Sequence, residues 1–174
     1  MKKIIIILTL ITIFLIYSEI KRESIIIPET AIRLRVIPNS NSVLDQSMKN
    51  KVKTYLEENT YKLLKNETDI EKARELIKDN IHSIEDNVKK IFRENNYDIK
   101  YDINYGYNYF PEKKYRGIKY EEGYYESIVI SIGDAEGDNW WCVLFPNLCM
   151  VDLEKTKDTE YKSWVIDTIN KIFK

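Results

Sequence analysis

The spacing of hydrophobic residues changes period along the chain, and each change predicts a different element. Residues 31–37 alternate, which predicts a strand with one buried face. Its apolar positions are Ile32, Leu34 and Val36, and they alternate with Ala31, Arg33 and Arg35. Turn formers in residues 38–42 end the strand, and an amphipathic helix follows that should end near Asn59. The apolar stripe of that helix consists of Leu44, Met48, Val52, Tyr55 and Leu56.

A second amphipathic helix begins at a capping pattern formed by Thr68 and Glu71 and runs for about 25 residues. The pair Asp79-Asn80 could divide it. Its stripe consists of Ile70, Ala73, Ile77, Ile81, Ile84, Val88 and Ile91. His82, the single histidine of the chain, falls away from this stripe, and we interpret it as a solvated surface residue rather than a ligand or base.

A period of two then predicts several strands. Residues 97–109 form a long strand with an aromatic face, and residues 127–133 are rich in β-branched side chains. Two short strands at 141–145 and 148–153 are joined by a turn, and residues 158–173 form a last helix. Because strands and helices are largely segregated, the sequence predicts an α+β domain with a mostly antiparallel sheet, two long N-terminal helices and a C-terminal helix.

The N-terminus predicts export from the cytoplasm. Two lysines precede residues 4–17, which contain no charged side chain, and Glu19 follows. As a helix the uncharged run measures about 21 Å, which is shorter than a bilayer core of about 30 Å. Residues 1–24 are therefore predicted to be an export signal or a short membrane anchor. Either places a single domain, residues 25–174, outside the cytoplasm.

The charge balance argues against nucleic acid as a partner. The whole chain has 27 basic and 28 acidic side chains, and without its first 24 residues it keeps 23 and 26, a net charge of −3. A protein that binds phosphate backbones needs an excess of basic residues, which is missing.

Few residues could carry out catalysis or bind a metal, so no cofactor, no metal and no enzymatic activity are predicted. One histidine excludes most catalytic triads and histidine-rich metal sites. Residues 134–138 begin like a calcium loop, with Asp134, Glu136 and Asp138, but Asn139 replaces the required glycine and Phe145 replaces the final glutamate. Glu122 and Glu126 lie among tyrosines, which leaves open a secreted cell-wall hydrolase that uses these two carboxylates.

The segment 137–149 concentrates unusual residues. It contains Trp140, Trp141, both cysteines and Pro146. In an oxidising compartment we expect a Cys142–Cys149 disulfide, and the alternative is two buried thiols. Neighbouring residues of a strand face opposite sides, so at most one of the two tryptophans can enter a single core. The other requires a second layer or a partner.

Aromatic residues and arginine on a rigid turn are typical of protein-binding hot spots. We therefore predict a partner-binding surface. Its candidate residues are Trp140, Trp141, Phe145, Pro146, Arg33 and Asn39.

Several of these segments resemble the stage II sporulation protein R family. The most specific is residues 139–149, which include Trp140, Trp141 and both cysteines. The other matching residues are Ile32-Arg33-Leu34, Asn39-Ser40, Asp45-Gln46, Lys49, Lys51-Val52-Lys53, Tyr109-Phe110-Pro111, Gly123-Tyr124-Tyr125-Glu126 and Ile130-Ser131-Ile132-Gly133. Asn147 departs from the second proline that is common in the family, and Asn41 from its usual acidic residue.

The resemblance implies a signalling protein made in the forespore and exported into the space between the two septal membranes. Such proteins activate a membrane-embedded aspartic protease of the mother cell, which cleaves the inactive precursor of sigma-E. It thus implies that protease as partner, close to a membrane. A membrane-tethered adaptor without a signalling role is a further alternative.

Overall fold

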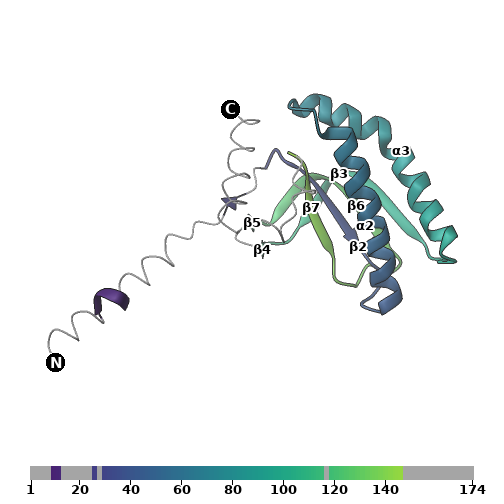
Figure 1. Ribbon diagram of the computed structural model, residues 1–174, viewed down its shortest axis with the longest axis horizontal. Helices are drawn as coiled ribbons and strands as arrows, with labels where there is room; N and C mark the ends of the chain where they lie inside the picture. Colours follow the sequence, from purple (N-terminus) through teal and green to yellow (C-terminus); the bar gives the residue numbers. More distant parts are fainter. Residues whose placement is uncertain (1–8, 13–24, 27–28, 116–117, 147–174) are drawn as a thin grey trace.

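The computed structural model describes residues 9–12, 25–26, 29–115 and 118–146. Two helices and a four-stranded sheet form the body of the protein, and a small three-stranded sheet lies beside it (Figure 1). The predicted strand at 148–153, the predicted helix at 158–173 and most of residues 1–24 lie outside the described residues. In the part of the chain that the structure describes, no helix has the length and apolar character needed to cross a membrane.

The main sheet has the strand order β3-β6-β2-β7. Its strands are β2 (Ile32–Ile37), β3 (Tyr101–Phe110), β6 (Gly123–Ile132) and β7 (Trp140–Phe145). The α+β class is confirmed, but the sheet is mixed, because β2 pairs parallel with β6 and antiparallel with β7. Helices α2 and α3 connect β2 to β3, and the antiparallel pair β3–β6 lies beside β2 in the main sheet. Strand periodicity carries no information on which strands become neighbours, so this parallel pair was not predicted.

The small sheet has the order β1-β5-β4, formed by β1 (Ile25–Ile26), β5 (Ile118–Tyr120) and β4 (Lys113–Tyr115). β1 pairs parallel with β5, and β4 pairs antiparallel with β5.

Helix α2 (Val43–Leu64) begins where predicted, and the Ser42 side chain caps it by accepting a hydrogen bond from the Asp45 amide. It ends five residues beyond the predicted end at Asn59. Met48, Val52 and Leu56 are buried as predicted. The prediction for Leu44 was wrong, because Leu44 is 59% exposed. The neighbouring Asp45 takes the inward position, and one residue along a helix turns a side chain by about 100°.

Helix α3 (Ile70–Glu94) is a single helix of 25 residues, so Asp79-Asn80 does not divide it. Asn80 stays within the helix by donating a hydrogen bond to the Leu76 carbonyl. The capping residue is Asp69 rather than Thr68, and its carboxylate accepts hydrogen bonds from the amides of Glu71 and Lys72. The two helices and one face of the sheet enclose the main core. Its helical residues include Val52, Leu56, Ala73, Ile77, Ile84, Val88 and Phe92.

The opposite face of the main sheet, here called the non-helical face, carries a second buried cluster. It consists of Ile37, Phe110, Tyr125 and Val129, with Trp141 packed against them. This corrects the prediction that residues 31–37 have one buried face: Arg33, on the face predicted to be polar, is 0% exposed.

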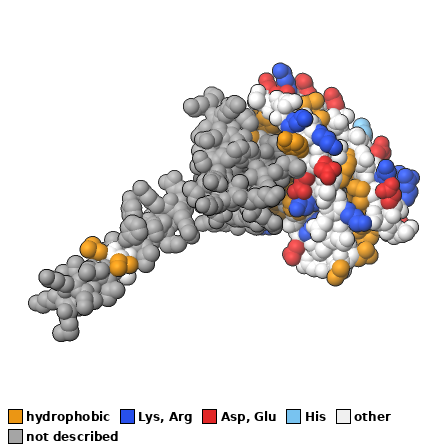
Figure 2. All heavy atoms as spheres, viewed as in Figure 1, with side chains coloured by type: hydrophobic (Ala, Val, Ile, Leu, Met, Phe, Trp, Pro, Cys, Tyr) orange, Lys and Arg blue, Asp and Glu red, His pale blue; other side chains and the backbone are white. Residues whose placement is uncertain are grey.

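Acidic and basic side chains are interspersed on the surface displayed in Figure 2, with hydrophobic side chains between them. This matches the formal net charge of −1 for the whole chain. His82 is on the surface, as predicted, with 90% of its side chain exposed.

Candidate partner-binding surface

Trp140 and Trp141 lie on opposite faces of the main sheet. Trp140 packs against the main core, while Trp141 packs against the cluster on the non-helical face. The sequence argument required that the second tryptophan have another layer or a partner, and the non-helical face supplies that layer. Both tryptophans remain partly exposed. The Lys53 ammonium lies 5.7 Å from the Trp140 ring, and the Lys113 ammonium lies 4.8 Å from the Trp141 ring.

Arg33 lies inside an aromatic cluster on the non-helical face. Its guanidinium carbon is 3.3 Å from the Tyr125 ring centroid, which is a stacked contact. The rings of Phe110 and Tyr120 lie 5.7 and 5.8 Å away. Trp141 in turn packs edge-on against Phe110, with the ring centroids 5.3 Å apart. A side chain enclosed in this way is not available to a partner in the described structure, although the sequence placed it among the contact residues.

The three guanidinium nitrogens of Arg33 are buried and have no hydrogen-bond partner among the described residues. Burial lowers the pKa of Arg33, while Tyr125, Tyr120 and Glu29 oppose this shift. The indole nitrogen of Trp141, on the same face, is also buried and without a described partner. These buried donors on the non-helical face have no acceptor within the part of the chain that the structure describes.

Phe145 and Pro146 are buried, so the sequence prediction of an exposed hydrophobic turn does not describe them. The peptide bond between them is cis. Cys142 lies in the main core with 8% of its surface exposed. Cys149 lies outside the described residues, so the disulfide between the two cysteines stays a prediction.

Asn39, another predicted contact residue, makes hydrogen bonds within the protein. Its amide nitrogen donates to Asp45 Oδ2 at 3.0 Å, and its amide oxygen accepts from the Asp134 amide at 2.9 Å. Its backbone carbonyl accepts from the Glu136 amide at 3.1 Å. Asn39 therefore joins the start of α2 to the loop between β6 and β7.

The sequence analysis missed Asp45 as the centre of this network. Asp45 is 6% exposed and accepts hydrogen bonds from Asn39, from the Ser40 hydroxyl at 2.6 Å and from the Tyr97 hydroxyl at 2.5 Å. These donors hold the pKa of Asp45 far below its usual range. The sequence signal that could have identified Asp45 was the position of its carboxylate among the inward-facing residues of an amphipathic helix.

The loop that resembles a calcium site serves the same network. The amides of Asp134, Glu136 and Asp138 donate to Asn39 and Asn41, and the Asp138 carbonyl accepts from Lys49 at 2.9 Å. No group of three potential metal ligands occurs within the described residues.

Glu126 and Glu122 occupy very different environments. Glu126 is 8% exposed, and its carboxylate accepts from Arg74 Nε at 2.8 Å and from the Tyr105 hydroxyl at 2.6 Å. Glu122 is exposed and accepts a long 3.4 Å hydrogen bond from the Tyr109 hydroxyl. Glu126 thus links β6 to α3 and β3, an arrangement that assigns it a role in packing.

Three exposed tyrosines form a surface that the sequence analysis did not single out, here called the tyrosine patch: Tyr107, Tyr109 and Tyr124. Their exposed fractions are 72%, 49% and 71%. The rings of Tyr109 and Tyr124, opposite each other on β3 and β6, pack edge to face with centroids 5.6 Å apart. They share the sheet face of Tyr105, which does pack against the main core.

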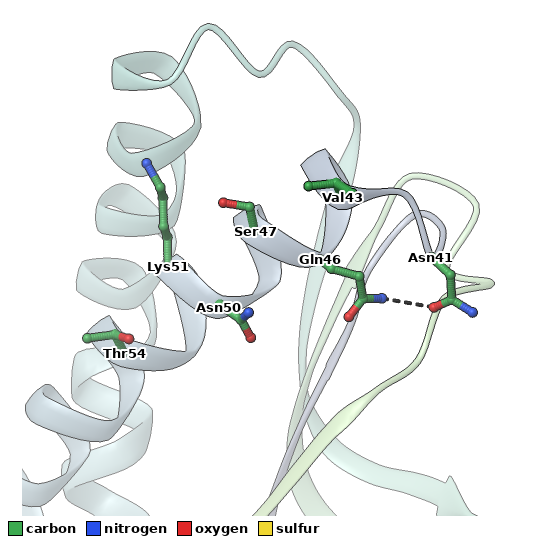
Figure 3. Close-up of a pocket in the computed structure, with 7 residues that line it drawn as sticks. All are labelled: Asn41, Val43, Gln46, Ser47, Asn50, Lys51 and Thr54. Atoms are coloured by element: carbon green, nitrogen blue, oxygen red, sulfur yellow. Dashed lines mark hydrogen bonds between the residues drawn. The ribbon is translucent and has the colours of Figure 1, made fainter.

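A hollow of about 770 Å³ lies on the N-terminal half of α2 (Figure 3). Figure 3 shows the Gln46 amide donating to Asn41 Oδ1, at 2.9 Å, at one end of it. The other residues that line it are Val43, Ser47, Asn50, Lys51 and Thr54. The described residues that line it include no carboxylate and no histidine.

Comparison with known proteins identifies the family. A sequence profile described as stage II sporulation protein R matches residues 28–155. The chain is 34% identical over 145 residues to stage II sporulation protein R of Bacillus subtilis (strain 168), a match that covers 82% of this chain and 65% of that relative. The chain thus spans less than two thirds of the length of this relative. No solved structure matches. The profile covers every strand and helix from β2 to β7, and the chain belongs to the stage II sporulation protein R family.

Proposed function

We propose that this protein is an exported sporulation signal that activates a membrane-embedded aspartic protease by direct contact. The activated protease would cleave the inactive precursor of sigma-E. The observation that carries the proposal is the family match over residues 28–155. The uncharged run near the N-terminus supports export into the space between forespore and mother cell, where the two membranes lie close together.

A signal that acts by contact needs a surface on which a partner can bury large side chains. The tyrosine patch fits this need, because tyrosine combines a large apolar area with a polar group and few rotatable bonds. We therefore propose Tyr107, Tyr109 and Tyr124 as contact residues. The exposed parts of Trp140 and Trp141 stay candidates, while buried Phe145 and Pro146 would act by holding β7 in place.

The decisive experiment is co-expression of this protein with the protease and the sigma-E precursor in a host that does not sporulate. Precursor size is followed by immunoblot. Cleavage only in the presence of this protein would support activation. If the precursor stays intact with all three proteins folded and correctly located, the proposal is wrong. Retention of residues 1–24 without any effect on the precursor would favour a tethered adaptor instead.

The same assay tests the contact surface. The double substitution Tyr107→Ser with Tyr124→Ser should reduce cleavage at least tenfold, because removing central aromatic residues costs an interface on the order of 2 kcal/mol or more. Tyr61→Ser is the matched control, since Tyr61 is a 43% exposed tyrosine on α2. Equal cleavage by the patch variant and the control would exclude the tyrosine patch and leave the two tryptophans to be tested by Trp141→Ala.

A further inference from the structure

Strand β3 forms a long and regular edge of the main sheet. It is the first strand in the order β3-β6-β2-β7, and among the described residues β6 is its only neighbour. Its 10 residues pair one for one with β6, and Asp102 is the single charged side chain among them. Natural proteins protect the edges of sheets with lysines, prolines or bulges, because an unprotected edge is a template for another strand. β3 contains none of these protective features.

The hydrogen bonds to β6 determine which backbone groups of β3 point outward. The Gly133 amide donates to the Lys100 carbonyl at 2.8 Å. These two residues continue the ladder in which Tyr101 pairs with Ile132. Hydrogen-bonded and non-hydrogen-bonded pairs alternate along an antiparallel ladder, so the even-numbered residues of β3 are the ones that bond to β6. The odd-numbered residues direct their N–H and C=O groups to the outer edge: Tyr101, Ile103, Tyr105, Tyr107 and Tyr109.

The side chains of these odd-numbered residues lie on one face of the sheet. Tyr101, Ile103 and Tyr105 pack against the main core but remain partly exposed, and Tyr107 and Tyr109 are exposed. Aromatic and β-branched side chains stabilise a pair of strands when they lie opposite each other. A strand added beside β3 would therefore gain both backbone hydrogen bonds and a row of large side chains to pack against.

The sequence of β3 is complementary to itself. Two copies that run antiparallel with Tyr105 opposite Tyr105 bring every outward-directed residue of one copy against an outward-directed residue of the other. The pairs are Tyr105 with Tyr105, Ile103 with Tyr107, and Tyr101 with Tyr109. Asp102 lies opposite Asn108 in this register, so no like charges meet within the strand. The occupant that these features favour is a second β3.

We infer that the outer edge of β3 pairs antiparallel with β3 of a second copy of this chain, with Tyr105 opposite its own copy. The main sheets of the two copies then form one continuous sheet. The pairing uses the backbone of β3 and leaves Tyr124, on the neighbouring β6, at the surface. The inference does not depend on the proposed function, because it is tested on the purified protein without the protease.

The first test is sedimentation equilibrium of the full-length protein in a density-matched non-ionic detergent. The unmodified protein should form a dimer, and Tyr107→Lys should raise its dissociation constant at least about tenfold. The reason is that the dimer would place a lysine ammonium against Ile103 at both of its symmetric contacts. Tyr124→Lys is the matched control, because Tyr124 is 71% exposed against 72% for Tyr107 but lies on the inner strand β6. It should change the dissociation constant by less than about twofold.

The second test is amide hydrogen exchange followed by NMR, which distinguishes the two edges of β3. In the dimer the amides of the odd-numbered residues should exchange slowly, and Tyr107→Lys should make them exchange at least about tenfold faster. The amides of Asn104 and Asn108 should stay protected in that variant, because their partners are on β6. Their protection also shows that the variant is folded.

A monomer at every concentration, or a dimer that Tyr107→Lys leaves intact, would overturn the inference. Slow exchange of the odd-numbered amides in a monomer would overturn it as well, and would assign the edge to another segment of the same chain. Slow exchange that appears in a monomer only after the protease is added would likewise overturn it, and would assign the edge to that protein.

Discussion

The hydroxyl of Tyr97 donates a 2.5 Å hydrogen bond to Asp45 Oδ1, which joins the residue pair Asn96-Tyr97 after α3 to the first turn of α2. Tyr97 is 8% exposed, and its ring also packs edge-on against Phe92. Since Asp45 also accepts from Asn39 and Ser40, one carboxylate holds together α2, the turn after α3 and the loop after β6. This network accounts for the burial of the Asp45 carboxylate.

The Asp45 network predicts a loss of stability in acid. The pKa of Asp45 is depressed in the folded protein, whereas an unfolded aspartate titrates near pH 4. The contribution of Asp45 to the free energy of unfolding is therefore complete above about pH 4 and is lost as the pH falls further. Asp45→Asn should cost about 2 kcal/mol at pH 7 and progressively less at lower pH. Urea unfolding between pH 2.5 and pH 7 measures this, and parallel pH curves for the two proteins would contradict it.

Tyr97 is expected to determine how the stability of the protein changes at alkaline pH. Burial and Asp45 raise the pKa of Tyr97. Stability from this group is thus present below about pH 10, the usual tyrosine value, and is lost as the pH rises through the folded pKa. Tyr97→Phe should cost about 1 kcal/mol at pH 7 and reduce the loss of stability above pH 10. Urea unfolding between pH 7 and pH 11 tests it, with Tyr107→Phe as control for an exposed tyrosine.

Gly137 is predicted to be intolerant of any side chain. A Cβ at this position would lie 2.3 Å from the Ser40 carbonyl oxygen, which is backbone and cannot swing away. Gly137→Ala should therefore cost about 2 kcal/mol or more in unfolding free energy. Gly106→Ala is the control, because a Cβ there meets only the Asn104 side chain at 3.6 Å. Equal stability of the two variants would show that the loop moves away from Ser40 without cost.

Glu126→Gln separates a role in packing from one in catalysis. It removes the charge that pairs with Arg74 and should cost about 1–2 kcal/mol in unfolding free energy. It should leave precursor cleavage in the co-expression assay intact at a temperature where the variant is folded. A hydrolase that uses Glu122 and Glu126 would instead release sugars from peptidoglycan, and Glu126→Gln would abolish that release. Sugar release by the unmodified protein would restore the hydrolase hypothesis.

The tyrosine patch should matter for contact and not for stability. Because Tyr107 and Tyr124 are 72% and 71% exposed, replacing both by serine should change the free energy of unfolding by about 1 kcal/mol or less. A comparable loss in cleavage and in stability would mean that the two tyrosines support the fold. The measurement is urea unfolding of the same preparations used to establish equal expression in the activation assay.

Local sequence patterns predicted a helix or strand well where that element packs against a single layer of the fold. The 3.6-residue stripe of α3 corresponds to the observed burial, because α3 packs against one layer, whereas β6 is buried on both faces. The argument from the neighbouring tryptophans also succeeded, since opposite faces follow from strand geometry alone. The alternation along β2 did not predict the burial of Arg33. Alternation distinguishes the two faces of a strand, but it does not show whether the second face is covered.

By itself the sequence determined helices α2 and α3, the strands of the main sheet, the α+β class and the resemblance to a sporulation family, since these depend on neighbouring residues and specific local motifs. It did not predict the short strands β1, β4 and β5 of the small sheet. The tertiary structure alone decided that β2 and β6 are parallel, that Asp45 is buried while Leu44 is exposed, and that Arg33 lies under aromatic rings. Those outcomes depend on residues far apart in the chain, such as Arg33 and Tyr125 or Asp45 and Tyr97. Burial is a property of the assembled layers, and no single segment contains it.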